Sequence, residues 1–269
     1  MRFFDTHCHL QSLELVSTLD GVLERADSAG VTKMLCCGTA ENDWAGVAAV
    51  CNRRKAPDAD TSTIIPAFGI HPWYMDGRSE KWREVLQDRL ADPRAAVGEI
   101  GLDHAIEKRN DAEQEEVFLA QWDLSVQLRR PVSMHCRRAW GRLLELLPKL
   151  GRHPVGFVIH SYSGPADIVG KLVEYGAHLS FSGSITRLKN RRGHEAARAV
   201  PPDRLLVETD SPDLAPVIPG RDPDAPNEPA NITFVAAKLA ELRNIAVEEL
   251  SETTYTNACR LFGEGNACN

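Results

Sequence analysis

The sequence predicts an α/β fold: a single (β/α)8 barrel (TIM barrel) with extra C-terminal helices, formed by one domain over residues 1–269. Eight short apolar or β-branched runs alternate with amphipathic stretches, and 269 residues suit one barrel of this kind. A doubly wound open sheet is the alternative, but it requires a glycine-rich phosphate loop after the first strand. Here that strand leads into Asp5-Thr6-His7-Cys8-His9. The barrel is therefore preferred.

The strands are expected where apolar runs are short and bounded by turn residues. The fourth and sixth of these runs are almost continuously apolar, as expected when both faces of a sheet are covered. The expected strands cover residues 2–6, 31–37, 64–70, 95–100, 131–135, 155–160, 177–181 and 204–209.

Helices are expected between these strands. In the fourth, Val117, Ala120, Leu124 and Leu128 form an apolar stripe at helical spacing. Asn110 or Asp111, followed by Glu113 or Gln114, resembles a capping box, and Pro165 suits the first position of the sixth helix. The expected helices lie near 13–29, 43–55, 79–90, 112–129, 139–150, 165–175 and 190–199, followed by a pair at 228–243 and 246–263.

Composition narrows the class of protein. Charged residues make up 26% and apolar residues 43% of the chain, and the net charge is −7. These values fit an ordinary globular protein and give it no overall electrostatic attraction to nucleic acid or to an anionic membrane. The seven cysteines have no CxxC spacing, which favours reduced thiols. With no leader or membrane segment visible, we expect a cytoplasmic location, although a nuclear or organellar one stays open. No obligate protein partner is evident.

Polar residues gather where the predicted strands end, on what would be one face of the barrel. Imidazoles and carboxylates together suit Zn²⁺, Mn²⁺ or a two-metal centre. A single histidine at a strand end is usually a structural residue, but a joint set points to a metal site. The set is His7, His9, His71, Glu99, Asp103, His135, His160, Glu208 and Asp210.

Eight motifs in order resemble those of the TatD family of metal-dependent deoxyribonucleases, within the amidohydrolase-like barrels. Together they extend over nearly the whole chain, from Phe3 to Phe262. The motifs are DTHCHL (5–10), GIHPW (69–73), GEIGLD (98–103), PVSMHCR (131–137), HSYSG (160–164), FSGSITR (181–187), LLVETDSP (205–212) and NEP (227–229).

The resemblance implies a centre of two divalent ions (Zn²⁺, Mg²⁺ or Mn²⁺) that share a water molecule. His7, His9, Glu99 and Asp210 would surround one ion. Glu99 would bridge to the second, which His135 and His160 would hold. The implied role of Asp210 is also that of general base.

Three further roles follow from the resemblance and from charge. His71 would hold the scissile phosphate or the leaving oxygen, and Glu208 would orient a neighbouring ligand. Arg137, two residues beyond His135, would grip a phosphate oxygen. Arg138 suits a solvated helix start better than a phosphate site. A second basic run extends from Arg187 to Arg192 and suits contact with a nucleic-acid backbone.

Some positions depart from the family pattern or stay open. His104 and Ser161 occupy positions where the family commonly has other residues, and neither is expected to touch the ligands. Trp73 and Tyr74 suit either stacking on a base or, for Trp73, core packing. Cys8, between two ligands of one strand, should point away from them into the core. The Pro- and Asp-rich segment 211–227 is expected to be an active-site loop.

The leading function is a metal-dependent nuclease that cleaves phosphodiester bonds of DNA, at ends or in single strands. A hydrolase of amides, esters or lactones on the same barrel is the runner-up, because the same ions would serve it. A metal-binding protein without activity is a third reading, and it would be signalled by a missing ligand. None of the expected ligands is missing.

Overall fold

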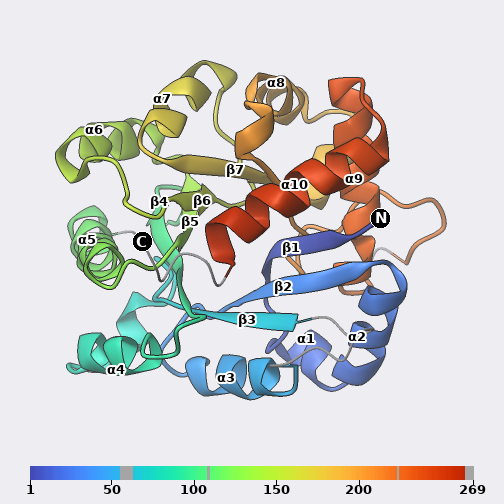
Figure 1. Cartoon of the computed structure of the whole chain (residues 1–269). Helices are drawn as coiled ribbons and strands as arrows, with labels where there is room; N and C mark the ends of the chain where they lie inside the picture. Colours follow the sequence, from blue (N-terminus) through green and yellow to red (C-terminus); the bar gives the residue numbers. More distant parts are fainter. Residues whose placement is uncertain (55–62, 108–109, 223, 264–269) are drawn as a thin grey trace.

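The computed structural model describes residues 1–54, 63–107, 110–222 and 224–263. Its eight strands form one parallel sheet in the order β1 to β8, with helices around the outside (Figure 1). The strands are β1 (Phe3–Cys8), β2 (Val31–Cys37), β3 (Thr63–Phe68), β4 (Ala96–Asp103), β5 (Val132–Arg137), β6 (Phe157–Ile159), β7 (Ala177–Phe181) and β8 (Leu205–Val207).

Backbone contacts between β1 and the chain after β8 nearly close the barrel. The amide of Asp210 donates to the His7 carbonyl at 2.9 Å, and the amide of His9 donates to the Ser211 carbonyl at 2.7 Å. Cys8 and Ser211 form an isolated parallel bridge. The predicted (β/α)8 barrel is confirmed, and its single sheet supports our proposal of one domain over 1–269.

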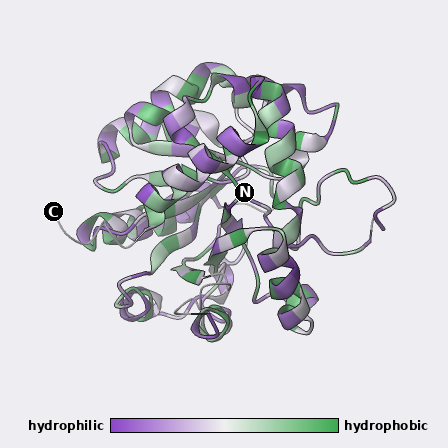
Figure 2. Ribbon diagram, turned by 45° about the vertical axis from the view of Figure 1, so that its right-hand side comes forward, coloured by the Kyte–Doolittle hydropathy of each residue, from purple (hydrophilic) through white to green (hydrophobic). Residues whose placement is uncertain are grey.

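The helices that cover the outside are two-faced, with hydrophilic and hydrophobic residues banded along them (Figure 2). Those between strands are α1 (Leu13–Val16), α2 (Leu19–Ser28), α3 (Trp44–Asn52), α4 (Trp82–Arg89), α5 (Asp111–Gln127), α6 (Trp140–Leu150), α7 (Val169–Glu174) and α8 (Arg191–Ala199). Short 3-10 turns are η1 (Met75–Gly77), η2 (Ala166–Ile168), η3 (Gly183–Thr186), η4 (Pro202–Arg204) and η5 (Pro229–Asn231).

The last two helices are α9 (Ile232–Arg243) and α10 (Val247–Phe262). Helix α10 lies across one opening of the barrel (Figure 1), where its Leu261 and Phe262 join a core with Phe4 and Leu206. Phe4 and Leu206 are the second residues of β1 and β8. The plugged end is therefore the N-terminal end of the strands, and the C-terminal end carries the polar residues.

Several boundaries differ from the sequence predictions. β1, β4 and β5 run two or three residues further than expected, so His7, Asp103 and Arg137 lie inside strands. The stretch 13–29 forms two helices, α1 and α2. Pro165 precedes the 3-10 turn η2 and is not the first residue of a helix.

Helix α5 confirms its predicted start and corrects its predicted inner face. The Asn110 side chain caps the helix by accepting from the amide of Glu113. The buried face, however, carries Phe118, Trp122 and two glutamines, and the predicted stripe is only partly buried beyond Val117. The reason is that Gln121 pairs with both backbone groups of Ile70, at 2.7 and 3.1 Å. A buried polar side chain that hydrogen-bonds the backbone after a strand has to lie on the inner face of the helix.

No helix in the described ranges is long and apolar enough to cross a membrane. The six cysteines that the structure describes are free thiols. Cys8 is buried, and its thiol donates to the Leu35 carbonyl at 3.4 Å, which confirms that it points into packing.

Candidate metal centre

The C-terminal ends of six strands bring most of the predicted site residues together. The inward-facing imidazoles and carboxylates come from β1, β4 and β5 and from the segments that follow β1, β3, β6 and β8. The residues that meet there are His7, His9, His71, Glu99, His135, His160, Glu208 and Asp210.

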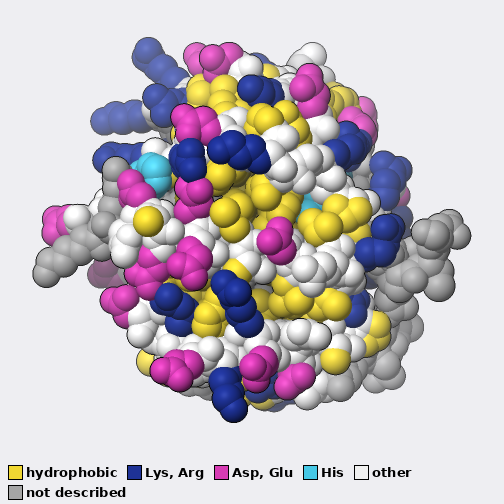
Figure 3. Space-filling model, turned by 90° about the vertical axis from the view of Figure 1, so that its left-hand side faces the viewer, with side chains coloured by type: hydrophobic (Ala, Val, Ile, Leu, Met, Phe, Trp, Pro, Cys, Tyr) yellow, Lys and Arg dark blue, Asp and Glu magenta, His cyan; other side chains and the backbone are white. Residues whose placement is uncertain are grey.

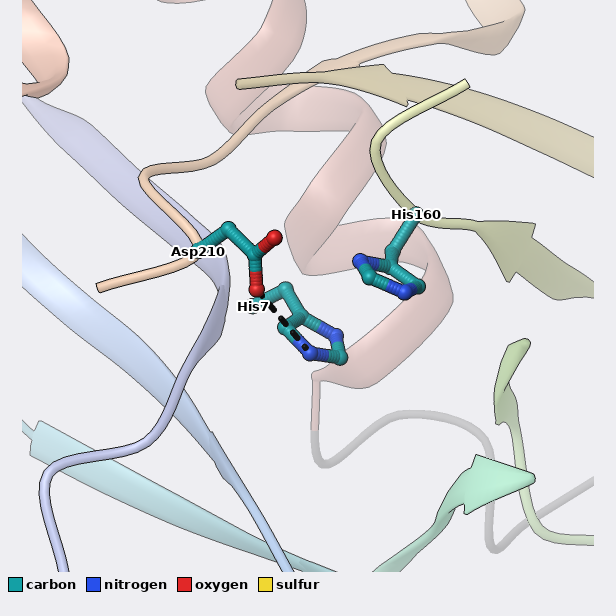
Figure 4. Close-up of side chains that lie close together, drawn as sticks. All are labelled: His7, His160 and Asp210. Atoms are coloured by element: carbon teal, nitrogen blue, oxygen red, sulfur yellow. Dashed lines mark ion pairs between the residues drawn. The ribbon is translucent and has the colours of Figure 1, made fainter. Parts of the chain in front are cut away.

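One carboxylate oxygen of Glu99 faces a first ligand set. Glu99 Oε2 lies 3.3 Å from His7 Nε2 and 3.7 Å from His9 Nε2. Asp210 Oδ1 lies 3.7 and 3.6 Å from the same two nitrogens, which are themselves 3.2 Å apart. Figure 4 shows Asp210 directed at the His7 ring, with His160 alongside. Four donor atoms therefore converge on one point.

The other oxygen of Glu99 faces a second set. Glu99 Oε1 lies 2.7 Å from His160 Nε2 and 3.1 Å from His135 Nδ1, and those two nitrogens are 3.3 Å apart. The His7 and His160 rings stack at 3.9 Å between centroids. Glu99 thus stands between two groups of imidazoles and turns one oxygen toward each.

Partners on the outer side of the rings fix which nitrogen is free to bind a metal. His9 Nδ1 donates to the Cys37 carbonyl at 2.8 Å, and His135 Nε2 donates to Asp103 Oδ2 at 3.0 Å. A neutral imidazole that donates from one nitrogen keeps a lone pair on the other. The free nitrogens, His9 Nε2 and His135 Nδ1, are the ones that face Glu99.

His71 has the opposite arrangement. The amide of Trp73 donates to His71 Nδ1 at 3.1 Å, so the ring proton of the neutral form sits on Nε2, which lies 3.3 Å from Glu99 Oε1. Burial lowers the pKa of His71 to about 4, which keeps the ring neutral at pH 7. His71 is therefore suited to donate a hydrogen bond and unsuited to bind a metal.

The carboxylates and histidines perturb each other strongly. Burial alone would raise the pKa of Glu99, but the histidines around it hold the pKa well below its usual range. Burial opposes a charge on His9, yet its hydrogen bond to Asp210 and the charge of Glu99 raise its pKa to about 9, so without a metal the ring also carries a proton on Nε2, which a bound ion would displace. Such mutual stabilisation of opposite charges in a buried cluster is typical of a functional site.

Asp103 anchors the second ligand set, a role that the sequence had not assigned. Its Oδ2 accepts from His135 Nε2 at 3.0 Å and from the Trp73 indole at 2.8 Å. Gln114 of α5 pairs with the backbone amide and carbonyl of Asp103, at 2.9 and 3.0 Å. Gly101, between Glu99 and Asp103, has no side chain because a Cβ there would overlap the His135 carbonyl.

Asp5 ties the first ligand set to the barrel. It is fully buried and accepts from the amides of His7 at 3.3 Å and Thr209 at 2.9 Å. These two amides belong to the segments that carry His7, His9 and Asp210. Asp210 itself has a positive φ of 58°, a backbone conformation that costs energy and is enriched at functional sites.

Ser161 corrects one expectation, because it does contact the site. Its hydroxyl donates to Glu208 Oε1 at 2.9 Å and lies 3.3 Å from Asp210 Oδ2. Its amide also donates to Glu208 Oε1 at 2.6 Å, and the same oxygen lies 3.5 Å from His160 Nδ1. Ser161, at φ 41°, therefore links two carboxylates beside the ligand His160. The sequence missed this contact because Ser161 reaches Asp210 only through the fold.

A cavity of about 580 Å³ opens beside the ligands, and Trp73 and Tyr74 stand on its wall. Both are half exposed, 48% and 47%, so the core-packing reading of Trp73 is wrong. Of the segment 211–227, Pro212 and Asp213 reach this cavity.

Arg137 is exposed at the end of β5 and does not line the cavity. It belongs to a group of six exposed cations after β5 and β7, which we call the cationic surface. No side chain of this group pairs with another described residue through a hydrogen bond or ion pair. The cationic surface consists of Arg137, Arg138, Arg187, Lys189, Arg191 and Arg192.

The residues present fit divalent metal ions. Ligands held tetrahedrally at about 2.0–2.2 Å from an ion lie roughly 3.3–3.6 Å from one another. In the first ligand set, the distances given above between pairs of ligand atoms are 3.2–3.7 Å. Mixed nitrogen and carboxylate donors suit Zn²⁺ or Mn²⁺ and also admit Mg²⁺.

Comparison with known proteins identifies the family of this chain. The family model described as TatD related DNase matches residues 4–263. The chain is 34% identical over 266 residues to the uncharacterized metal-dependent hydrolase YcfH of Escherichia coli (strain K12), covering 97% of this chain and 96% of that protein. It is 32% identical over 270 residues to the 3'-5' ssDNA/RNA exonuclease TatD of Citrobacter koseri, covering 97% and 98%.

Solved structures are also similar to this chain. The crystal structure of the TatD homolog YJJV from Escherichia coli K12 superposes with a TM-score of 0.88 at 29% identity and covers 97% of this chain and 98% of that chain. An organophosphorus hydrolase from Deinococcus radiodurans, at 17% identity and a TM-score of 0.62 over 97% and 93% of the chains, shares the fold alone. This chain therefore belongs to the family of TatD related DNases and is a metal-dependent hydrolase.

Proposed function

We propose that this enzyme hydrolyses phosphodiester bonds of DNA with two divalent ions and acts as an exonuclease on ends or single strands. The observation that carries the proposal is the position of Glu99, whose two oxygens face separate ligand sets at 2.7–3.7 Å. A carboxylate placed in this way can bridge a pair of ions. The names of relatives, a 3'-5' ssDNA/RNA exonuclease and a putative deoxyribonuclease of Danio rerio, support a nucleic-acid substrate.

His7, His9, Asp210 and Glu99 would hold one ion, and Glu99 with His135 and His160 would hold the other. When bound, such ions lower the pKa of a water molecule and neutralise charge on a phosphodiester. Asp103 and the Cys37 carbonyl keep the ligating imidazoles in the required tautomer. Glu208 Oε1, which accepts hydrogen bonds from Ser161, lies 3.5 Å from His160 Nδ1 on the outer side of that ring.

Asp210 is the proposed general base. Burial would raise its pKa, but His9 and the other histidines lower it, so the group is ionised at neutral pH as a base must be. Its Oδ1 faces His7 and His9, while among the described residues Oδ2 has only the Ser161 hydroxyl, at 3.3 Å, as a hydrogen-bond donor. Oδ2 is therefore the atom that can accept a proton from water.

His71 and the cationic surface are the proposed phosphate contacts. The Nε2–H of neutral His71 points into the site and can donate to a phosphate oxygen or to the leaving oxygen. Arg137 would bind a phosphate further along the strand, because it lies outside the cavity. The free thiols of the described cysteines fit a reducing compartment, and a cytoplasmic location stays our prediction.

The test is a substrate panel on protein stripped of metal and reloaded with Zn²⁺, Mn²⁺ or Mg²⁺ one at a time. We expect end-labelled single-stranded DNA to be shortened from an end, with duplex DNA and RNA run in parallel. Cleavage of esters, amides or lactones with intact oligonucleotides would instead identify the runner-up hydrolase.

Asp210→Asn is the matched variant for this panel. It should lower kcat by about 10²–10⁴-fold, the usual contribution of a general base, while circular dichroism shows the wild-type fold. An unchanged kcat in this variant would remove Asp210 from the role of base.

A further inference from the structure

The cavity beside the metal centre extends away from the ligands, toward the segments that follow β1, β2 and β3. Its volume of about 580 Å³ is that of a site for one small-molecule-sized group. The metal centre forms part of its lining, and Leu13, Asn42 and Tyr74 form another part. The cavity is therefore large enough for a substrate unit next to the reacting bond.

Trp73 and Tyr74 give this cavity a fixed aromatic wall. The Trp73 indole is held by its hydrogen bond to Asp103 Oδ2 at 2.8 Å and by an edge-to-face contact with His71, 5.0 Å between centroids. The Tyr74 ring lies 5.9 Å from His71. Both rings stay about half exposed. Exposed aromatic rings beside a cavity, one of them fixed by a hydrogen bond, are suited to stack on a base.

The charges of the cavity are the opposite of those expected for a phosphate channel. Glu14, Asp43 and Asp213 line it, and none of its described lining residues is Lys or Arg. The cationic surface lies elsewhere, after β5 and β7. The end of the molecule opposite α10 is on the left in Figure 3, where Lys and Arg gather toward the top and acidic side chains below them.

We infer that this cavity is the subsite for the terminal nucleoside of a strand, with its base stacked on Tyr74 and its edge against Trp73, whose ring is inclined at 67° to that of Tyr74. The inference rests on the proposed function, which places the scissile phosphate at the metal centre. A nucleoside is neutral, so the carboxylates of Glu14, Asp43 and Asp213 do not repel it. They repel a further phosphate, so the subsite prefers an end that terminates in a hydroxyl. The rest of the strand leaves over the cationic surface.

The first experiment measures binding and needs no turnover. Metal-loaded protein is titrated by calorimetry with deoxyadenosine 5′-monophosphate and with deoxyribose 5-phosphate, which lacks the base. The nucleotide should bind about tenfold more tightly or better, the usual effect of stacking one base. Equal affinities would overturn the subsite.

Variants assign that difference to the aromatic wall. Tyr74→Ala should reduce the preference for the nucleotide several-fold, and Trp73→Phe should keep most of it because a ring remains. Phe234→Ala is the matched control, since Phe234 is a 41% exposed aromatic residue of α9 outside the cavity. A preference that Tyr74→Ala and Phe234→Ala leave equally unchanged would overturn the assignment.

The second experiment compares oligonucleotides with hydroxyl groups at both ends and with phosphates at both ends. Oligonucleotides with phosphorylated ends should be digested at least about tenfold more slowly than those with hydroxyl ends. The double variant Glu14→Gln, Asp213→Asn should reduce this difference in rate. Equal digestion of both substrates would contradict the acidic wall. If nucleotide binding shows the preference while no oligonucleotide is cleaved, the proposed function fails and the nucleoside subsite stands.

Discussion

The two ends of the barrel both bury histidines, but they use them differently. At the N-terminal end, burial lowers the pKa of His153 and of His178 to about 4, and each ring is a neutral part of the packing. At the C-terminal end His9 is also buried, yet the carboxylates of Asp210 and Glu99 raise its pKa to about 9. The difference lies in the carboxylates that face the ring, and burial alone does not mark a site.

Neighbouring groups show the same contrast. His153 has ordinary hydrogen-bond partners on both nitrogens, the Ser125 hydroxyl at 3.0 Å and the Gly156 amide at 3.0 Å. Three of the ligating histidines, His7, His9 and His135, have a hydrogen-bond partner on the outer nitrogen. The inner nitrogens of the ligating histidines face one another and Glu99. The C-terminal end therefore gathers several imidazole and carboxylate atoms within reach of one cation, and no such cluster occurs at the N-terminal end among the residues described.

Removing the shared carboxylate should have the largest effect. Glu99→Gln keeps the shape but loses the charge between the ligand sets, so we expect activity to fall roughly a thousandfold or more, the loss of several kcal/mol of charge stabilisation. Metal content by plasma emission should fall in parallel. Retention of both ions together with wild-type activity would show that Glu99 does not join the two sets.

His153→Gln tests the opposite end through pH. The pKa of His153 falls from 6.5 to about 4 on folding, so its contribution is present above pH 6.5 and is lost as pH falls toward 4. Wild-type protein should lose about 3 kcal/mol of unfolding free energy from this group across that range. The variant should lose less unfolding free energy over the same pH range, measured by urea unfolding at a series of pH values. Its activity at pH 7.5 should be unchanged. An altered metal content would contradict a purely structural role.

Asp103→Asn should have an intermediate effect. An amide that donates to His135 Nε2 would force the ring proton onto Nδ1, the nitrogen that faces Glu99. We expect metal affinity or activity to fall about 10–100-fold, as for other partners of ligating histidines. The imidazole tautomer, read by ¹⁵N NMR, separates this from a packing defect, because only a positioning role predicts that the His135 proton moves.

Arg137→Ala should have the smallest effect. We expect a modest rise in KM, with kcat retained, and a decrease of about one in the slope of log binding constant against log salt. Arg129→Ala is the matched control, because this exposed arginine lies just before the N-terminal end of β5 and Arg137 lies at its C-terminal end. Identical salt slopes for the Arg137 variant and the control would remove Arg137 from the phosphate contacts.

The hydrophobic periodicity of the chain, together with the polar residues at the ends of the expected strands, predicted much of the fold and of the site. The alternation of short apolar runs with amphipathic stretches was enough for the barrel, since β2 and β7 begin and end where expected. Boundaries were wrong where a polar residue sits inside a strand. Glu99 and His135 read as residues at or beyond a strand end, yet β4 and β5 continue past them because their backbones still pair.

The residues that hold the predicted ligands in place could not be predicted in this way. Asp103, Gln114 and Ser161 act through partners that are 11 to 49 residues away in the chain, and no local pattern records such pairs. The position of the Trp73 ring could not be predicted either, because it is fixed by Asp103 of β4, 30 residues away in the chain.

By itself the sequence determined the fold class and the ligand types, because hydrophobic period and residue chemistry are local properties of the chain. Only the tertiary structure decided which oxygen of Glu99 faces which histidines, that His71 donates a proton where the other imidazoles present a lone pair, and that the cavity is acidic while the cations lie outside it. These are relations between side chains from different strands, and they come into existence only when the barrel closes.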